Sequence, residues 1–210
     1  MSLRRHIRVT TPPASEPVTV AEAKLWLKVD GDDDDDLLTG LIAAAREAAE
    51  SFTGRAFITQ AVTLTLDLGC SGWANELPDG VYDLPVSALY GALPRIISLS
   101  RPPVSAITSV TTTDTTNTAT AFSSANYTLD AAGSRLLLND GSYWPTNLRP
   151  AAAISVLTAN GYGATGASVP QPIRHAILMH VASMYESRLV CDLPAACRAL
   201  LQPFKVYGEV

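Results

Sequence analysis

The hydrophobic periodicity of the sequence changes twice, and this constrains the fold more than any other feature. Near both ends, apolar residues recur at three- and four-residue steps, whereas from about residue 57 to 162 they alternate at period two between turn residues. The first pattern is typical of amphipathic helices and the second of half-buried strands. The sequence therefore predicts an α+β fold, a helical bundle formed by N- and C-terminal helices with an inserted small antiparallel β domain.

The expected domain boundaries follow the same changes. The basic N-terminal segment carries Arg4, Arg5 and Arg8 without a following apolar stretch, so it is not a secretory signal, and its default is a solvated arm. We expect the protein to be made and kept in a cytoplasm. The predicted units are the arm (1–16), a helical body (17–56 and 168–203), a β-rich insertion (57–167) and a C-terminal docking tail (204–210).

Two N-terminal helices are predicted. Residues 19–22, Thr-Val-Ala-Glu, have the spacing of a capping box and start a short helix. A longer helix follows on an apolar stripe over residues 38–52, with Gly54 just past its end. Glu47 and Glu50 lie off this stripe, and one of them is expected to face solvent or another subunit.

The C-terminal part returns to helix. Residues 168–171, Ser-Val-Pro-Gln, again have capping-box spacing, and the core face of the helix runs from Ile173 to Tyr185. Pro194 is expected to start a last short helix, and Pro203 to stop it.

Several short strands are expected in the middle. Alternating or buried runs predict strands within residues 62–68, 107–113, 136–138 and 154–158. The threonine-rich segment 111–120 fits a hairpin or a loop, and Asp114 and Asn117 favour the loop because they interrupt the pattern.

The composition suggests association with other subunits. The chain is 47% hydrophobic but only 17% charged, below the roughly 25% of average proteins. No apolar run approaches the ~18 residues of a membrane span, so we expect partner subunits to cover surplus apolar surface.

The net charge of −5 argues against broad binding of nucleic acid. Cys70, Cys191 and Cys197 are expected to be reduced and buried.

An acidic run, Asp30-Gly31 followed by Asp32, Asp33, Asp34, Asp35 and Asp36, is the most conspicuous motif. An EF-hand loop needs glycine at its sixth position and glutamate at its twelfth, where this chain has Asp35 and Leu41. The expected structure is an acidic turn before a helix N-terminus, where the helix dipole favours carboxylates. The surplus charge suggests a surface that a polyanion passes without binding.

The sequence gives no support for a catalytic or metal-binding motif. His175 and His180 are five residues apart and point in different directions from one helix, so they do not form a metal-binding pair. Trp73 and Trp144 fit a core or loop anchor better than a sugar-stacking platform. We therefore expect no enzymatic activity, no cofactor and no metal.

Short segments spread in order over most of the chain carry a family resemblance. They are Pro17–Lys24, Leu27–Asp30, Asp35–Leu38, Leu41–Glu47, Thr53–Arg55, Arg101–Val104, Gly161–Gly163, Val169–Pro170, Ile173–Arg174, Ala176–Leu178 and Leu200–Phe204. As an ordered set they resemble the head-to-tail connector (adaptor) proteins of long-tailed phages and phage-derived gene transfer agents. The longer aspartate run and residues 90–98 depart from the family pattern.

This resemblance implies a structural virion protein, assembled in the bacterial cytoplasm, that forms a ring, commonly a dodecamer, beneath the portal. Its implied partners are other copies of the chain, the portal protein, the next tail-side connector or tail terminator, and double-stranded DNA that passes without specific binding. No membrane or cofactor is implied.

The resemblance also suggests roles for residues of this chain. The portal-docking candidates are Leu200, Leu201, Phe204, Val206 and Tyr207. Asp32, Asp33, Asp34, Asp35 and Asp36 are candidates for an acidic channel or rim surface. Independently of the resemblance, the basic arm makes Arg4, Arg5 and Arg8 candidates for phosphate contacts. The alternatives are a DNA-packaging accessory that binds DNA directly and, less favoured, a carbohydrate-binding or enzymatic module on the β insertion.

Overall fold

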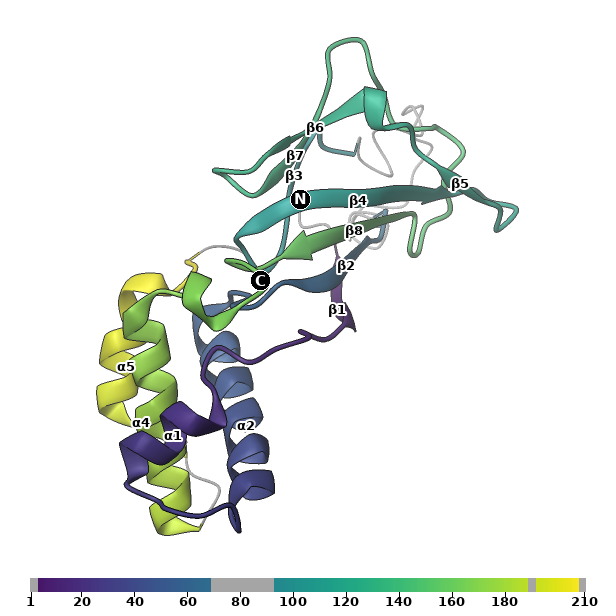
Figure 1. The fold of residues 1–210 in the computed structure, drawn as a ribbon. Helices are drawn as coiled ribbons and strands as arrows, with labels where there is room; N and C mark the ends of the chain where they lie inside the picture. The colour runs from purple at the N-terminus through teal and green to yellow at the C-terminus, as the bar shows by residue number, and fades with distance from the viewer. Residues whose placement is uncertain (1–3, 69–92, 189–191, 208–210) are drawn as a thin grey trace, which may run out of the picture.

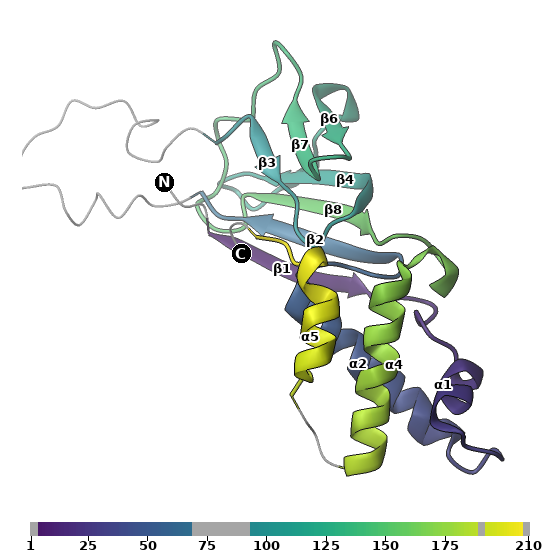
Figure 2. The same ribbon diagram turned by 90° about the vertical axis from the view of Figure 1, so that its left-hand side faces the viewer.

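The computed structural model describes residues 4–68, 93–188 and 192–207 as an α+β fold with two antiparallel sheets (Figure 1). The expectations for Cys70, Trp73 and Cys191 lie outside the described residues. Helices pack side by side at one end of the molecule, and the sheets lie at the other end (Figures 1 and 2).

The helices begin and end largely where the sequence predicts. Their bounds are α1 Val20–Leu27, α2 Asp35–Thr53, α4 Gln171–Ser187 and α5 Ala195–Leu201, with 3-10 turns η2 Ser124–Asn126, η3 Gly166–Ser168 and η4 Gln202–Phe204. The capping box of α1 is confirmed, because the Glu22 amide donates to the Thr19 hydroxyl at 3.2 Å and the Thr19 amide donates to the Glu22 carboxylate at 2.9 Å. Gly54 ends α2 at φ 70°, in the left-handed region that suits glycine.

The capping box predicted at Ser168 is wrong. Ser168 ends η3, and Pro170 is the N-cap of α4 without a side-chain hydrogen bond. The Ser168 side chain lies so close to Gly163 that a Cβ there would clash with it. The hydroxyl therefore contacts the preceding loop and not the helix.

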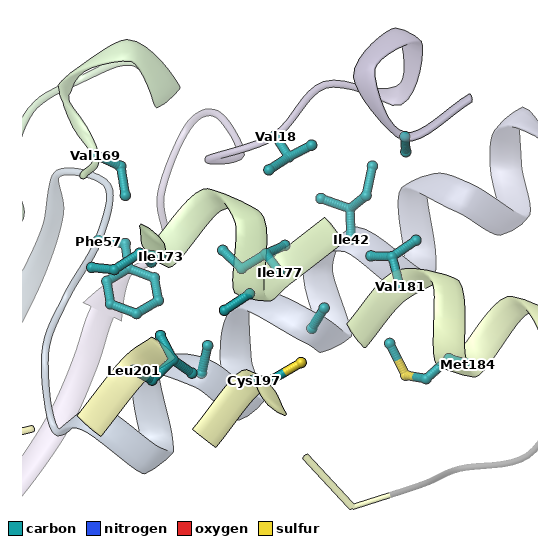
Figure 3. Close-up of a cluster of buried hydrophobic side chains, with 14 of the residues drawn as sticks. Val18, Ile42, Phe57, Val169, Ile173, Ile177, Val181, Met184, Cys197 and Leu201 are labelled. Carbon is teal, nitrogen blue, oxygen red and sulfur yellow. The ribbon is translucent and has the colours of Figure 1, made fainter. Parts of the chain in front are cut away.

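The first hydrophobic core joins the helices (Figure 3). The predicted apolar stripes of α2 and α4 are buried in this core, and α5 packs against both helices. The buried residues include Leu38, Ile42, Ala45 and Ala49 of α2, Ile173, Ile177 and Val181 of α4, Cys197 and Leu201 of α5, and Phe57 and Ile58 before the sheet.

The larger sheet has the order β1-β2-β8-β4-β5 and the smaller sheet β3-β7-β6. Their strands are β1 Arg5–Thr11, β2 Gln60–Leu66, β3 Ile96–Ser98, β4 Val104–Thr113, β5 Ala119–Ala121, β6 Tyr127–Asp130, β7 Arg135–Leu138 and β8 Ile154–Asn160. β2 and β8 alternate between buried and partly buried residues, the pattern of a sheet with one covered face. A second core, with Leu64, Ile97 and Leu136, brings the two sheets together.

The threonine-rich segment is a hairpin and not the favoured loop. Thr111 to Thr113 of β4 pair with Ala119 to Ala121 of β5. Asp114 builds the turn, because its Oδ1 accepts the backbone amides of Thr116 and Thr118, both at 2.9 Å. The residue that was expected to interrupt the strands thus connects them.

The expectation of a solvated N-terminal arm is also wrong. Arg5–Thr11 form β1, an antiparallel edge strand on β2, with Ile7 opposite Leu64 and Val9 opposite Val62. Residues 6–10 alternate between polar and apolar, as in a strand, but the cluster of arginines favoured a solvated arm. An edge strand tolerates such residues because one of its sides faces water.

A buried carboxylate connects α2 to the start of β2, so Glu50 does not face solvent or another subunit. Its Oε1 accepts the Phe57 amide at 2.8 Å and the Gln60 side-chain amide at 3.1 Å. Its Oε2 lies 3.3 Å from Arg46 Nη1 and 3.6 Å from Arg101 Nη1. With its side chain only 3% exposed, Glu50 is stable there because four groups compensate its burial.

We expect Glu50→Ala to lower the free energy of unfolding by about 3–5 kcal/mol, since it leaves buried donors and Arg46 without their acceptor. Glu47→Ala is the matched control, because that side chain is 72% exposed and should change stability by less than about 0.5 kcal/mol. Urea unfolding measures both. Equal effects would contradict a connecting role for Glu50.

Candidate docking surfaces

The C-terminal segment folds back onto its own subunit. Leu201 is fully buried in the helical core, while Leu200 and Phe204 pack against it partly buried. The Val206 amide donates to the Thr53 carbonyl at 2.8 Å, and Arg55 Nε donates to the Phe204 carbonyl at 2.5 Å. Leu201 is therefore a core residue and is not available to a partner, contrary to its predicted docking role.

Tyr207 differs from the other docking candidates because it is 72% exposed. The Lys205 ammonium lies 4.9 Å from the Phe52 ring centre and 5.9 Å from that of Tyr207, and the Tyr207 hydroxyl accepts a hydrogen bond from Gln202. These contacts hold an exposed aromatic ring beside the end of α2.

The acidic turn is partly neutralised within the subunit. Asp32 lies 2.8 Å from Lys24 Nζ, and Asp35 also pairs with Lys24. The Lys24 hydrogen bond lowers the pKa of Asp32, and the Asp32 hydrogen bond raises the pKa of Lys24. Of the five candidate aspartates, Asp33 and Asp36 remain exposed without an ion pair in the described part of the chain.

The remaining aspartate of the run connects two helices. Asp34 Oδ2 accepts the Tyr185 hydroxyl of α4 at 2.6 Å, and this hydrogen bond raises the pKa of Tyr185. The turn is thus positioned by α1 and α4 together. Among the described residues, no group of His, Cys, Asp or Glu side chains could hold a metal ion.

The basic residues in β1 and just before it lie at the edge of the larger sheet. Arg4 and Arg8 are exposed and Arg5 is partly buried, and none of them forms a salt bridge within the described ranges. His6 is 3.3 Å from Asp67 Oδ2. The Ala152 amide, with His6 as a smaller cause, lowers the pKa of Asp67.

His175, His180 and Trp144 do not come together in a ligand site. The ring of His175 lies 5.9 Å from that of Trp26, while His180 is buried on the core side of α4. Trp144 is buried, donates to the Pro94 carbonyl at 3.1 Å and stacks on Phe122 at 4.8 Å. It anchors the second core.

In the described part of the chain, no helix has the length and apolarity needed to cross a membrane.

Sequence reasoning missed the contacts that join distant segments. Arg174 of α4 donates to the Pro17 carbonyl at 3.0 Å and pairs with Glu22 of α1. Arg46 Nε similarly donates to Glu16 at 2.8 Å. Nothing in local periodicity pairs residues so far apart, although each arginine beside an apolar stripe is a signal that a carboxylate must lie near it.

Comparison with known proteins agrees with the resemblance found in the sequence. Residues 17–86 match the family model described as phage gp6-like head-tail connector protein. A comparison with curated protein sequences gives no significant match.

The fold is similar to that of chains in three particle structures. A chain in "Neck of empty GTA particle computed with C6 symmetry" has TM-score 0.73 and 18% identity over 98% of this chain and 97% of that one. One in "Virion of native gene transfer agent (GTA) particle" has TM-score 0.70 and 18% identity, covering 97% of each chain. One in "Neck of native GTA particle computed with C12 symmetry" has TM-score 0.69 and 20% identity, over 100% of this chain and 98% of that one. The predicted resemblance to head-tail connector proteins is confirmed.

The capping box of α1 generates a prediction of pH dependence. The Thr19 backbone hydrogen bond is the largest cause that lowers the pKa of Glu22, with Arg174 contributing. We expect Glu22→Gln to cost about 0.5–2 kcal/mol of stability at pH 7. Because the folded pKa is depressed, this difference exists above the unfolded value of about 4.3 and disappears as pH falls through the folded value.

Urea unfolding of both proteins at neutral and acidic pH measures this difference. Glu186→Gln, an exposed change on α4, serves as the control and should leave stability unchanged. A Glu22→Gln effect of the same size at both pH values would show that the carboxylate charge is not its cause.

Proposed function

We propose that the protein is a structural connector of a phage or gene transfer agent particle, forming a ring between the portal and the tail. The observation that carries the proposal is the near full-length similarity of fold to chains in gene transfer agent particles, together with the family match over residues 17–86. The C6 and C12 symmetries of those neck structures support a ring, with twelve copies as the working number.

The proposed ring lets double-stranded DNA pass. A conduit needs few attractive contacts to phosphate, because each retained contact would slow sliding, and a chain with net charge −5 meets this need. Native mass spectrometry of purified particles tests the proposal. The chain should be present at one ring per particle, and its absence from particles would overturn the connector role.

Portal docking, in this proposal, depends on Tyr207. Its ring is the exposed aromatic group of the C-terminal segment, whereas Leu201 belongs to the core. Exposed aromatic rings held by neighbouring contacts are common anchors of protein interfaces.

Tyr207→Ser should therefore weaken binding to the portal protein encoded with this chain by at least about fivefold, with little change in the free energy of unfolding. Leu201→Ala is the contrasting variant, since it should lose about 2–5 kcal/mol of stability through a core cavity. Biosensor binding and urea unfolding separate the two effects. Wild-type affinity in Tyr207→Ser would exclude this anchor.

The acidic turn is proposed to lie at the channel or its rim. Asp33 and Asp36 are the residues available for this role, because the other three aspartates contact Lys24 or Tyr185. The double substitution Asp33→Asn/Asp36→Asn should leave folding intact and reduce DNA delivery per particle, since it removes repulsion from phosphate.

Delivery assays on particles of equal DNA content measure this effect. Asp32→Asn is the matched control, because the Asp32 carboxylate is already paired with Lys24. Unchanged delivery in the double variant would identify the run as a solvated helix start only.

A DNA-packaging accessory remains the second candidate because Arg8 of β1 and Arg4, just before this strand, are both exposed. It requires salt-dependent binding of duplex DNA by the isolated protein, which a connector does not.

A further inference from the structure

The outer edge of β1 is a surface to which the connector proposal gives no role. β1 lies at one end of the strand order and pairs with β2, and within the described residues no other strand pairs with it. The register between β1 and β2 is regular from Arg5 to Val9 and shifts between Val9 and Thr11. Among the described residues, Arg5–Val9 therefore form a regular edge to which no further strand is paired.

The direction of the backbone groups follows from one hydrogen bond. The Asp67 amide donates to the Arg4 carbonyl at 3.1 Å, which makes Arg4 a hydrogen-bonded partner of β2. Such partners alternate along an antiparallel strand, so His6 and Arg8 direct their backbone groups toward β2. Arg5, Ile7 and Val9 direct their amides and carbonyls away from the sheet, toward a partner strand.

The side chains along this edge favour a negatively charged partner. Arg5 and Arg8 have no salt bridge in the part of the chain that the structure describes, and Ile7 is 40% exposed. Two copies of the edge would bring together two surfaces of the same sign, which disfavours pairing between identical strands. Arg5 and Arg8 lie on opposite faces of the sheet, because successive side chains of a strand alternate. An extended segment with carboxylates along one face would therefore complement the backbone groups and the arginine on that face.

We propose that the Arg5–Val9 edge of β1 accepts an extended acidic segment of a partner protein as an added strand. Main-chain hydrogen bonds to Arg5, Ile7 and Val9 supply the binding, and the arginines supply the preference for acidic sequences. The inference concerns the isolated subunit, so its failure would leave the ring and the portal contact untouched.

A dye-labelled synthetic peptide in which glutamate alternates with valine is the probe. Fluorescence anisotropy should show binding to the full chain. It should show at least about tenfold weaker binding of a peptide with lysine in place of glutamate, because the arginines would repel it. Hydrogen exchange should show new protection of the Arg5, Ile7 and Val9 amides, with the His6 and Arg8 amides unchanged.

Two substitutions at one position separate the backbone from the side chain. Ile7→Pro removes an outward amide, and an edge strand tolerates proline there because the ladder to β2 does not use that amide. It should weaken peptide binding about tenfold or more, whereas Ile7→Ala should weaken it less than about threefold. Protection of the His6 and Arg8 amides verifies that β1 stays paired in both variants.

Each contrary result has a clear meaning. Equal losses in Ile7→Pro and Ile7→Ala would overturn strand addition in favour of a side-chain contact. Undetectable peptide binding would overturn the inference. Tighter binding of a duplex DNA probe, insensitive to Ile7→Pro, would replace it with a phosphate-binding strand.

Discussion

The Glu50 carboxylate is the interaction on which the relation between helices and sheets depends. It lies near the end of α2, where the chain leaves the helical core, and accepts the amide of Phe57 and the side chain of Gln60 at the entrance to β2. Arg101 approaches it from the connection before β4. A buried charge with these partners is costly to misplace, since any other packing would leave it uncompensated. The junction is therefore specified by polar contacts, whereas the two cores on either side of it are apolar.

Segments near both ends of the chain fold onto elements distant in sequence. Arg5–Thr11 extend the larger sheet at β2, and the C-terminal segment returns to the end of α2 through the Val206 and Thr53 backbone contact. Residues that look like free tails in the sequence thus complete structural elements. The surfaces proposed for partners are the Tyr207 ring, Asp33 and Asp36, and the outer edge of β1, and large apolar side chains such as Leu25 and Tyr143 are exposed as well.

Helix positions could be predicted because their signals are local. The Thr19 capping box and Gly54 mark helix ends by contacts within a few residues, and the stripes of α2 and α4 identify the core. The role of Glu50 could not be predicted, because a glutamate beside an apolar stripe looks the same whether water or a buried amide satisfies it. β1 was missed for a related reason, since an edge strand is defined by a partner far along the chain. Similarly, Asp114 could be read as a break or as a turn until its strands were seen to pair.

The low charge content acquires a more specific meaning from these contacts. Many of the charged residues compensate one another inside the subunit, as in the pairs Arg46 with Glu16, Arg174 with Glu22, and Lys24 with Asp32. Such pairs position helices and contribute little to an external field, because opposite charges in contact cancel at distances beyond the Debye length of about 8–10 Å. Exposed charges without an ion pair among the described residues then contribute most to what an approaching molecule meets. They include Asp33 and Asp36 at one end of α2 and the arginines of β1 at the sheet edge, besides residues such as Lys28 and Glu186. Because DNA and an acidic segment are both anionic, the arginines would attract either of them and Asp33 and Asp36 would repel either, so the outward amides and carbonyls of β1, and not charge alone, would distinguish a partner strand from DNA.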